Sequence, residues 1–141
     1  TVEIGGTPVT LANVHLWPFV TFYRDGQARG LARQHEQAQQ LQEWLGEQSG
    51  PTLVMGDFNA SPTNRTYQLI SQQATDSWTR SWGTGFTFPG RPIRFIEFPV
   101  LRIDYLWYRG DIVPRQVEVL DDSAGSDHLP LVADFVLITP R

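Results

Sequence analysis

Two polar side chains stand two positions apart just after a short apolar run. The run is Leu53-Val54-Met55, which is typical of a buried strand and ends at Gly56. Asp57 and Asn59 follow it. In an extended backbone, side chains two positions apart lie on the same face, so a carboxylate and a carboxamide would project together from the strand's end. In α/β proteins, ligands usually bind at this end of a strand. Asp57 and Asn59 could equally bond their own backbone in a turn.

Four other polar residues stand out because of where they fall in the sequence. His15 lies near the end of segment 9–16, where apolar and polar residues alternate as in a strand. Asp104 interrupts an apolar, strand-like run, where an acid is costly unless it has a partner. Asp127 and His128 are adjacent and precede the last apolar run. Taken singly, each has an ordinary structural explanation, such as a surface histidine or a polar loop.

Taken together, these residues supply the parts of a metal-assisted hydrolysis of a phosphate ester. That reaction needs a divalent cation, a base that activates water, and donors that hold phosphate oxygens. Asp57 and Asp127 supply the carboxylate oxygens that Mg²⁺ prefers. A base that titrates near neutrality points to histidine, which works better when a carboxylate such as Asp104 orients it. Asn59 and His15 can donate hydrogen bonds to phosphate.

The elements that must position these residues follow from the hydrophobic pattern. Helices alternate with strands in the first half of the chain, and strands dominate the second half. This order predicts an α/β (α+β) fold with a mixed β-sheet and helices on one face. The expected elements are strands over 9–16 and 53–55, helices over 29–47 and 63–72, a turn or short helix within 74–80, a loop over 83–99, and strands over 102–108, 112–120 and 131–137.

Three of these elements carry more specific predictions. The helix over 29–47 has glutamine, glutamate and arginine opposite an apolar stripe. Ser61 and Pro62 predict the start of the second helix, as an N-cap followed by proline. The long loop over 83–99 is rich in aromatic residues, which we expect to contact a base, a sugar or a lipid tail, while Arg91 and Arg94 meet phosphate. The stripe consists of Leu31, Ala32, Ala38, Leu41, Trp44 and Leu45.

Composition limits the classes of protein to consider. The 141 residues are one domain's worth of chain, so we expect residues 1–141 to form a single domain, with 40% hydrophobic residues to fill its core. The net charge is −4 and all eleven basic residues are arginine, which argues against broad, nonspecific nucleic-acid binding. The absence of cysteine excludes disulfides and thiolate metal sites and leaves the compartment undetermined. No apolar run approaches the roughly 20 residues of a membrane span.

Four short motifs, in this order, resemble those of the endonuclease/exonuclease/phosphatase superfamily. The superfamily includes pancreatic deoxyribonuclease, abasic-site endonucleases, sphingomyelinases and inositol polyphosphate 5-phosphatases. The resemblance extends from Val9 to Val136 and implies divalent-metal-dependent hydrolysis of a phosphate ester or phosphodiester, with Mg²⁺ or Mn²⁺ as cofactor. The motifs are Asn13-Val14-His15-Leu16, Gly56-Asp57-Phe58-Asn59, Arg102-Ile103-Asp104-Tyr105 and Ser126-Asp127-His128.

The resemblance also implies a role for each site residue. His128 would be the general base or would stabilise the scissile phosphate, and Asp104 would orient it. Asp57 would hold or activate the attacking water, or assist at the metal. Asn59 would position Asp57 and the phosphate, and Asp127 would be a metal ligand.

His15 would bind a phosphate oxygen. The segment Thr87-Phe88-Pro89 also resembles bacterial membrane-associated members thought to act on lipid phosphates. The acidic net charge and the aromatic loops favour a small or lipid phosphate as the substrate over duplex nucleic acid. A nuclease acting on DNA or RNA is the alternative, and a third hypothesis is an inactive, truncated half-domain that serves as an interaction module.

One part of the family pattern has no counterpart in this sequence. Family members begin with a half-domain that carries the principal metal-binding glutamate, and neither Glu3 nor Glu36 has that context. The resemblance therefore implies the C-terminal half of the family domain, which supplies one half of a four-layer α/β-β/α sandwich. We expect the sheet face that would meet the other half to be exposed and apolar, and to pair with a second copy or a separate N-terminal half.

Overall fold

The computed structural model describes residues 1–18 and 24–138 of the chain. Among the described helices, none has both the length and the apolar character needed to cross a membrane. The elements are, in chain order, β1 (Val2–Ile4), β2 (Thr7–His15), α1 (Arg24–Glu47), β3 (Thr52–Asp57), α2 (Arg65–Ile70), β4 (Thr75–Asp76), the 3₁₀ helix η1 (Ser77–Arg80), β5 (Asp104–Arg109), β6 (Ile112–Val119) and β7 (Leu131–Leu137).

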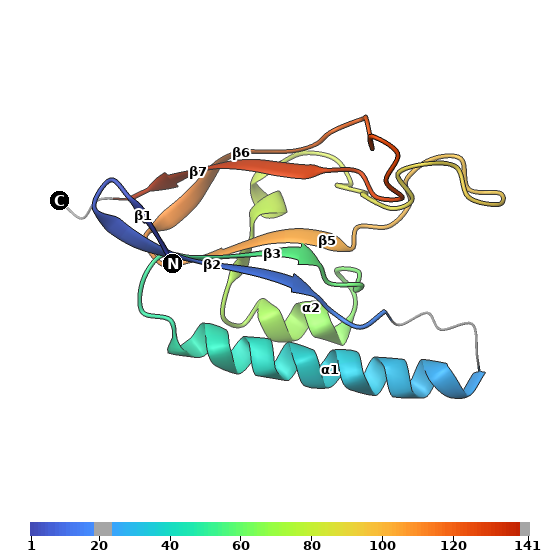
Figure 1. The fold of residues 1–141 in the computed structure, drawn as a ribbon, viewed down its shortest axis with the longest axis horizontal. Helices are drawn as coiled ribbons and strands as arrows, with labels where there is room; N and C mark the ends of the chain where they lie inside the picture. The colour runs from blue at the N-terminus through green and yellow to red at the C-terminus, as the bar shows by residue number, and fades with distance from the viewer. Residues whose placement is uncertain (19–23, 139–141) are drawn as a thin grey trace.

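A mixed five-stranded sheet forms the centre of the molecule. Its strand order is β1-β2-β3-β5-β4, and β2 runs parallel to β3, whereas the other neighbouring pairs are antiparallel. The parallel pair needs a crossover connection, which α1 provides. Figure 1 shows α1 and α2 together on one side of this sheet. The predicted mixed sheet with helices on one face is therefore confirmed.

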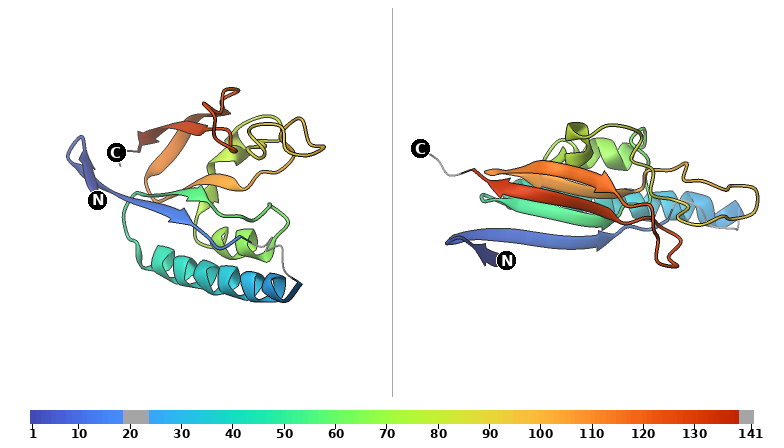
Figure 2. Two further views of the ribbon diagram at one scale, coloured as in Figure 1. Left: turned by 45° about the vertical axis from the view of Figure 1, so that its right-hand side comes forward. Right: turned by 90° about the horizontal axis from the view of Figure 1, so that it is seen from above.

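A second, two-stranded sheet lies on the side of the main sheet away from the helices. It consists of β6 and β7, which pair antiparallel with a register shift between Pro114 and Gln116, as the proline predicts. Figures 1 and 2 show this hairpin stacked over the main sheet. Nothing in the hydrophobic pattern indicates this separation, because a strand's pattern shows which of its faces is buried and not which sheet it joins.

The main core fills the space between the five-stranded sheet and the helices. Aromatic residues of β5, of α2 and of the turn after β3 meet there; for example, the rings of Phe58 and Tyr105 are 5.4 Å apart and pack edge to face. The buried members of this core are Leu16, Leu41, Leu45, Val54, Phe58, Ala60, Ile70, Ala74, Tyr105 and Trp107.

The buried stripe of α1 differs from the predicted one. Gln34, Ala38, Leu41 and Leu45 are buried, at helical spacing, whereas Leu31 is 47% exposed and Ala32 is also exposed. Figure 1 shows the N-terminal part of α1 extending past the ends of β2 and β3, so the sheet does not cover that part of the stripe. The prediction that glutamines lie opposite the stripe is wrong for Gln34.

The start of α2 is also corrected by the structure. Asn64, not Ser61, is the N-cap, because its side-chain oxygen accepts a hydrogen bond from the Thr66 N–H at 3.0 Å. Ser61 instead accepts a hydrogen bond from Asn64 N–H through its carbonyl oxygen. The sequence offers two capping residues three positions apart, and a preceding turn places the second one at the helix start.

A second core cluster joins the two sheets at the end away from the site residues. Val9, Tyr108 and Ile112 are buried there, and Phe135 and Leu137 of β7 pack against them. Closer to β2 the same sheet face is open, and Leu11 is 39% exposed. The β6–β7 hairpin therefore covers part of the face that was expected to be exposed, and leaves the part over β2 accessible.

Candidate active site

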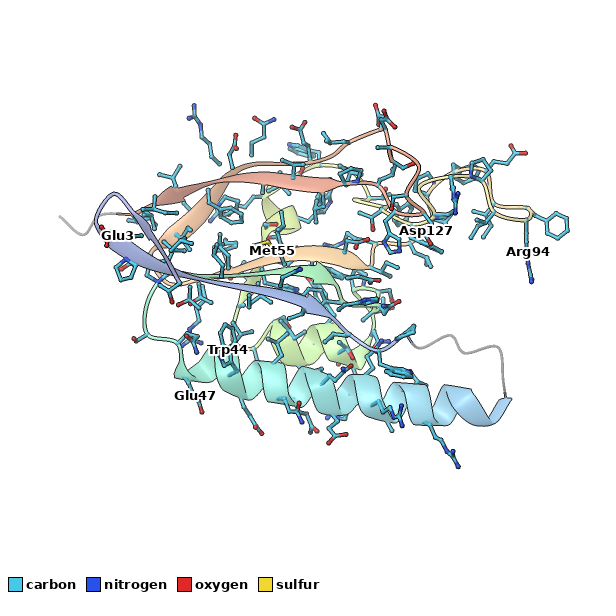
Figure 3. The ribbon with its side chains drawn as sticks, in the orientation of Figure 1. Glu3, Trp44, Glu47, Met55, Arg94 and Asp127 are labelled. Carbon is cyan, nitrogen blue, oxygen red and sulfur yellow. The ribbon has the colours of Figure 1, made fainter. Side chains whose placement is uncertain are left out.

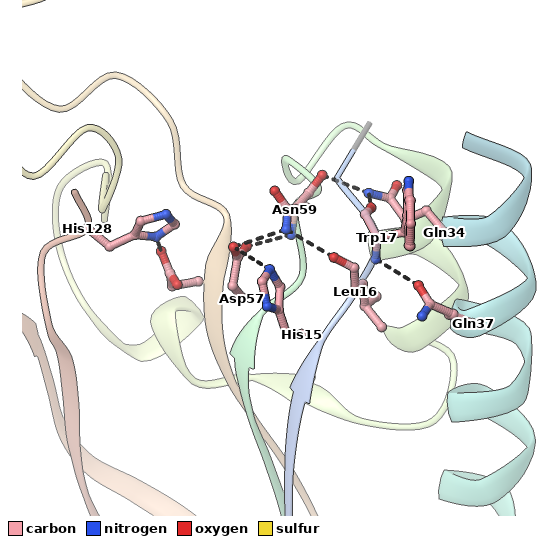
Figure 4. A network of polar contacts seen from close by, with 9 residues as sticks. His15, Leu16, Trp17, Gln34, Gln37, Asp57, Asn59 and His128 are labelled. Carbon is pink, nitrogen blue, oxygen red and sulfur yellow. Dashed lines mark hydrogen bonds and ion pairs between the residues drawn. The ribbon is translucent and has the colours of Figure 1, made fainter. Parts of the chain in front are cut away.

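Three of the predicted site residues lie side by side at the ends of neighbouring strands. His15 at the end of β2 is in register with Asp57 at the end of β3, and Asp57 is in register with Asp104 at the start of β5. Because β5 runs antiparallel to β3, its first residue falls at the same edge as the last residue of β3. Figure 4 shows His15 pointing to Asp57, and their Nε2 and Oδ2 atoms are 3.5 Å apart.

The turn after β3 fixes the position of the Asp57 carboxylate. Asn59 has a positive φ of 49°, which asparagine tolerates, and its backbone N–H donates to Asp57 Oδ1 at 2.7 Å. Its side-chain Nδ2 donates to Asp57 Oδ2 and to the Leu16 carbonyl, both at 3.0 Å. Both amide hydrogens are thus used within the protein, so Asn59 positions Asp57 in this structure. Asp57 and Asn59 therefore form a turn with their own backbone and also belong to the candidate site.

Gly56 allows β2 and β3 to approach closely beside this turn. Its φ is +133°, and a Cβ added there would lie 1.9 Å from the carbonyl oxygen of Val14. Only glycine fits such a contact. The glycine that ends the apolar run in the sequence thus sets how closely Asp57 lies to the end of β2.

His128 reaches the same site from the segment before β7. Its Nδ1 lies 2.8 Å from Asp104 Oδ2, and the two side chains are 25% and 18% exposed. The ring of Phe88 packs against the imidazole, with the centroids 5.0 Å apart. Asp104, whose position within an apolar run required a partner, therefore has one.

The long loop over 83–99 holds the backbone around His128. Gly90 N–H donates to the Asp127 carbonyl at 2.6 Å, and Leu129 N–H donates to the Thr87 carbonyl at 2.7 Å. A Cβ added at Gly90 would lie only 2.5 Å from the carbonyl carbon of His128. Sequence reasoning identified the loop but missed these positioning roles, because they depend on backbone contacts that leave no pattern in the sequence.

Comparison with known proteins shows which family the chain belongs to. A sequence model of the Endonuclease/Exonuclease/phosphatase family matches residues 2–128. The chain belongs to this family. The resemblance carried by the four motifs is thereby confirmed. No curated protein matches the chain.

Solved structures share the fold over most of this family member. A functionally unknown conserved protein from Enterococcus faecalis V583 is 30% identical, with 90% of this chain aligned to 49% of that one and a TM-score of 0.61. The human Nocturnin catalytic domain, solved with a bound sulfate anion, is 27% identical over 90% of this chain and 46% of that one, with a TM-score of 0.58.

A third structure, an endonuclease/exonuclease/phosphatase family protein from Leptotrichia buccalis C-1013-b, resembles this chain in its fold alone. It is 17% identical, with a TM-score of 0.69 over 96% of this chain and 52% of that one. The chain therefore spans about half the length of these relatives.

The electrostatics of this family member's site are dominated by its two carboxylates. Burial raises the pKa of Asp57 above its ordinary value, and the nearby Asp104 raises it further, while the Asn59 N–H opposes the shift. The hydrogen bond with Asp104 raises the pKa of His128, against the effect of burial. The site therefore gathers negative charge, and His128 binds a proton more tightly there than a histidine does in water.

A divalent cation fits the donor atoms that converge here. One ligand atom each from Asp57, Asp104 and His128 lies within 4.8 Å of the others. Carboxylate oxygens suit Mg²⁺ and Mn²⁺, and a cation would offset both the burial and the repulsion by Asp104 that raise the pKa of Asp57. His128 Nδ1 is already engaged with Asp104, so the imidazole could reach a cation only through Nε2, and the carboxylate oxygens are the ligands that suit Mg²⁺ best. Asp127 is exposed and is not a member of this cluster.

Gln34 ties the site to the helices, which sequence reasoning missed. Its Nε2 donates to the carbonyls of Trp17 at 2.8 Å and Asn59 at 2.9 Å, and its Oε1 accepts from Thr66 Oγ1 at 3.1 Å. Figure 4 shows this amide between the segments that follow β2 and β3. The signal was available, since Gln34 lies four residues before Ala38 on the apolar stripe and so had to be buried with partners.

Proposed function

We propose that this chain carries part of the catalytic site of a divalent-metal-dependent phosphoesterase. The observation that carries the proposal is the contact between His128 and Asp104, made beside the half-buried Asp57 carboxylate. A histidine held by one carboxylate and facing a second one is the arrangement that general acid–base chemistry at a metal-bound phosphate requires. Family membership supports the same reaction class.

Each side chain has a specific task in this proposal. Asp104 accepts the Nδ1 proton of His128, which leaves Nε2 of the neutral ring free to take a proton from water or to contact a phosphate oxygen. Asn59 holds Asp57 toward the metal and the water. The His15 side chain is 74% exposed and lies beside Asp57, so it can donate to a phosphate oxygen.

The proposed cofactor is Mg²⁺ or Mn²⁺, with Asp57 and Asp127 as ligands and Asp104 close by. When bound, the cation would offset charge on the phosphate and favour ionisation of a bound water. The proposal for Asp127 rests on its position next to His128, since its side chain lies outside the convergent cluster.

The proposed substrate is a small phosphoester or a lipid phosphate. The net charge of −4 disfavours a long contact with the nucleic-acid backbone, which a nuclease would need. The 27% identical Nocturnin domain was solved with sulfate, a tetrahedral oxyanion, so a related fold accommodates that charge and shape. Cleavage of DNA or RNA remains the alternative to be tested.

We also propose that the open sheet face over β2 packs against another polypeptide. Leu11 is 39% exposed on this face, and Val2 and Ile4 of β1 are exposed at the neighbouring edge. A second copy of the chain or a separate N-terminal half would bury these side chains. Light scattering of the isolated chain, with a Leu11→Glu variant, would show whether self-association depends on this face.

The reaction is tested with bis-p-nitrophenyl phosphate in Mg²⁺, in Mn²⁺ and in EDTA. We expect hydrolysis that requires metal and falls at least about 100-fold in His128→Ala. His35→Ala is the matched control, because His35 lies on α1 outside the site, and we expect no change there. Cleavage of plasmid DNA without hydrolysis of the small diester would favour the nuclease. Absence of hydrolysis in every assay, with a stable dimer in solution, would favour the interaction module.

A further inference from the structure

The loop over 83–99 contains a narrow hairpin, which projects from the body of the molecule. Ile93 and Ile96 exchange two backbone hydrogen bonds of 2.9 Å, and Arg94 at the turn has a φ of 51°. Figures 1 and 3 show this hairpin extending past the ends of the sheet strands, with Arg94 at its far tip. The two cross-strand bonds give the tip a defined shape.

Large apolar side chains are exposed on the hairpin, whereas other aromatic residues of the chain are buried in the core. Phe95 is 98% exposed, Phe98 is 68% exposed and Ile96 is 37% exposed. A soluble domain rarely groups such side chains on one protrusion unless they contact another apolar phase or surface. Their clustering at the tip of a protrusion, away from both core clusters, indicates that they contact something outside this chain.

Two arginines accompany these aromatic residues. Arg91 and Arg94 are exposed on the same segment, and Glu97 is its acidic residue, so the segment carries a local charge of +1 in a chain whose net charge is −4. Guanidinium groups pair with phosphate through two parallel hydrogen bonds. Apolar side chains flanked by guanidinium groups match the layering of a lipid surface, where acyl chains lie beneath phosphates.

The base of the hairpin is attached to the candidate active site. Gly90 contacts the backbone of His128 too closely for a Cβ, and Phe88 packs on the His128 ring. These contacts fix the direction of the loop relative to the imidazole. A surface that receives the tip would therefore lie next to the residues proposed to act on phosphate.

We propose that the hairpin is a membrane anchor, which inserts Phe95 and Phe98 into the interface of an anionic lipid surface while Arg91 and Arg94 contact lipid phosphates. The inference deepens the proposed function, since it places the substrate in that surface. Vesicle binding needs no turnover, so failure of binding and failure of hydrolysis are separate results. A nucleic acid and a second copy of the chain are the other occupants, and the test distinguishes them.

The test is co-sedimentation with vesicles of phosphatidylcholine alone and of phosphatidylcholine with 30% phosphatidylglycerol, whose negative surface potential attracts arginine. We expect binding to the anionic vesicles and at least about a tenfold loss in the double variant Phe95→Ser, Phe98→Ser. Arg91→Gln with Arg94→Gln should remove the preference for anionic vesicles. His128→Ala should bind as the wild type does.

Val136→Ser is the control for loss of an exposed apolar side chain elsewhere, since Val136 is 47% exposed on β7, and its binding should be unchanged. Failure of the wild type to bind either vesicle would overturn the proposal. So would equal binding by the double phenylalanine variant. Phe95-dependent binding to a single-stranded oligonucleotide, or Phe95-dependent dimerisation without vesicle binding, would assign the hairpin to those occupants instead.

Discussion

His128 Nδ1 lies 2.8 Å from Asp104 Oδ2, although the segments that carry the two residues lead into different sheets. Asp104 begins β5 of the main sheet, and His128 precedes β7 of the two-stranded sheet. The pair therefore bridges the two sheets at the edge where Asp57 also lies. The chemistry of the site depends on how the β6–β7 hairpin packs over the main sheet.

The charge of Asp104 should set the proton affinity of His128. We expect Asp104→Asn to lower the pKa of His128, because the hydrogen bond with the carboxylate is the main cause of its upward shift. NMR titration of the imidazole in EDTA measures this pKa, with His35 as an internal reference. Asp111→Asn, which removes an exposed carboxylate from the turn before β6, is the control. An unchanged His128 pKa in Asp104→Asn would contradict the proposed pairing.

The same pair predicts how stability depends on pH. The folded-state pKa of His128 is raised, so its stabilising contribution is complete below the unfolded-state pKa of about 6.5 and is lost as the pH rises through the folded-state value. The free energy of unfolding should therefore exceed that of His128→Gln by more at about pH 5.5 than at about pH 9. Urea denaturation in EDTA measures both differences. A difference that grows with pH would have the wrong sign.

Gln34 should matter for stability more than any surface glutamine on the same helix. In Gln34→Leu, the carbonyls of Trp17 and Asn59 and the Thr66 hydroxyl lose a buried partner, so we expect a loss of about 1–3 kcal/mol in the free energy of unfolding. Gln39→Leu is the matched control on the exposed face of α1, with an expected change within about 0.5 kcal/mol. Equal stability of the two variants would show that the hydrogen bonds of Gln34 do not stabilise the fold.

The contact between Gly90 and His128 should not tolerate a methyl group. Gly90→Ala would force the loop away from the His128 backbone, with an expected cost of about 1–3 kcal/mol and a shift of the His128 imidazole resonances. Gly46→Ala is the control, because the nearest atoms to its added Cβ belong to the Gln73 side chain at 3.7 Å. That change, within a helix, should stabilise by about 0.5–1 kcal/mol. Unshifted His128 resonances in Gly90→Ala would contradict the positioning role.

The parts of the site that lie on strands could be predicted from the sequence. His15 and Asp57 each fall at the boundary between an apolar strand and a polar segment, and neighbouring strands of one sheet bring such boundaries to a common edge. The sequence predicts Asp104 inside a strand over 102–108, whereas β5 begins at Asp104 itself, so its place at this edge comes from the structure. Asp104 also required a partner, and His128 provides it. The roles of these residues stay predictions until they are measured.

The parts that escaped prediction depend on contacts between distant segments. The separate β6–β7 sheet and the contact of Gly90 with His128 leave no periodic pattern in the sequence. Helical spacing places Gln34 on the buried stripe of α1, but it does not show which groups Gln34 bonds to. The cap of α2 was misplaced because Ser61 and Asn64 are both good capping residues, and the turn between them decides which one begins the helix.

The central claim is that the Asp57 and Asp104 carboxylates bind a divalent cation beside His128. Paramagnetic broadening of the histidine resonances by Mn²⁺ tests it without turnover. We predict that His128 broadens at the lowest Mn²⁺ concentrations, and that Asp57→Asn requires at least about tenfold more Mn²⁺ for the same effect, whereas Asp111→Asn requires no more than the wild type. If His128 in Asp57→Asn broadens at the same Mn²⁺ concentration as in the wild type, these residues do not form the proposed site.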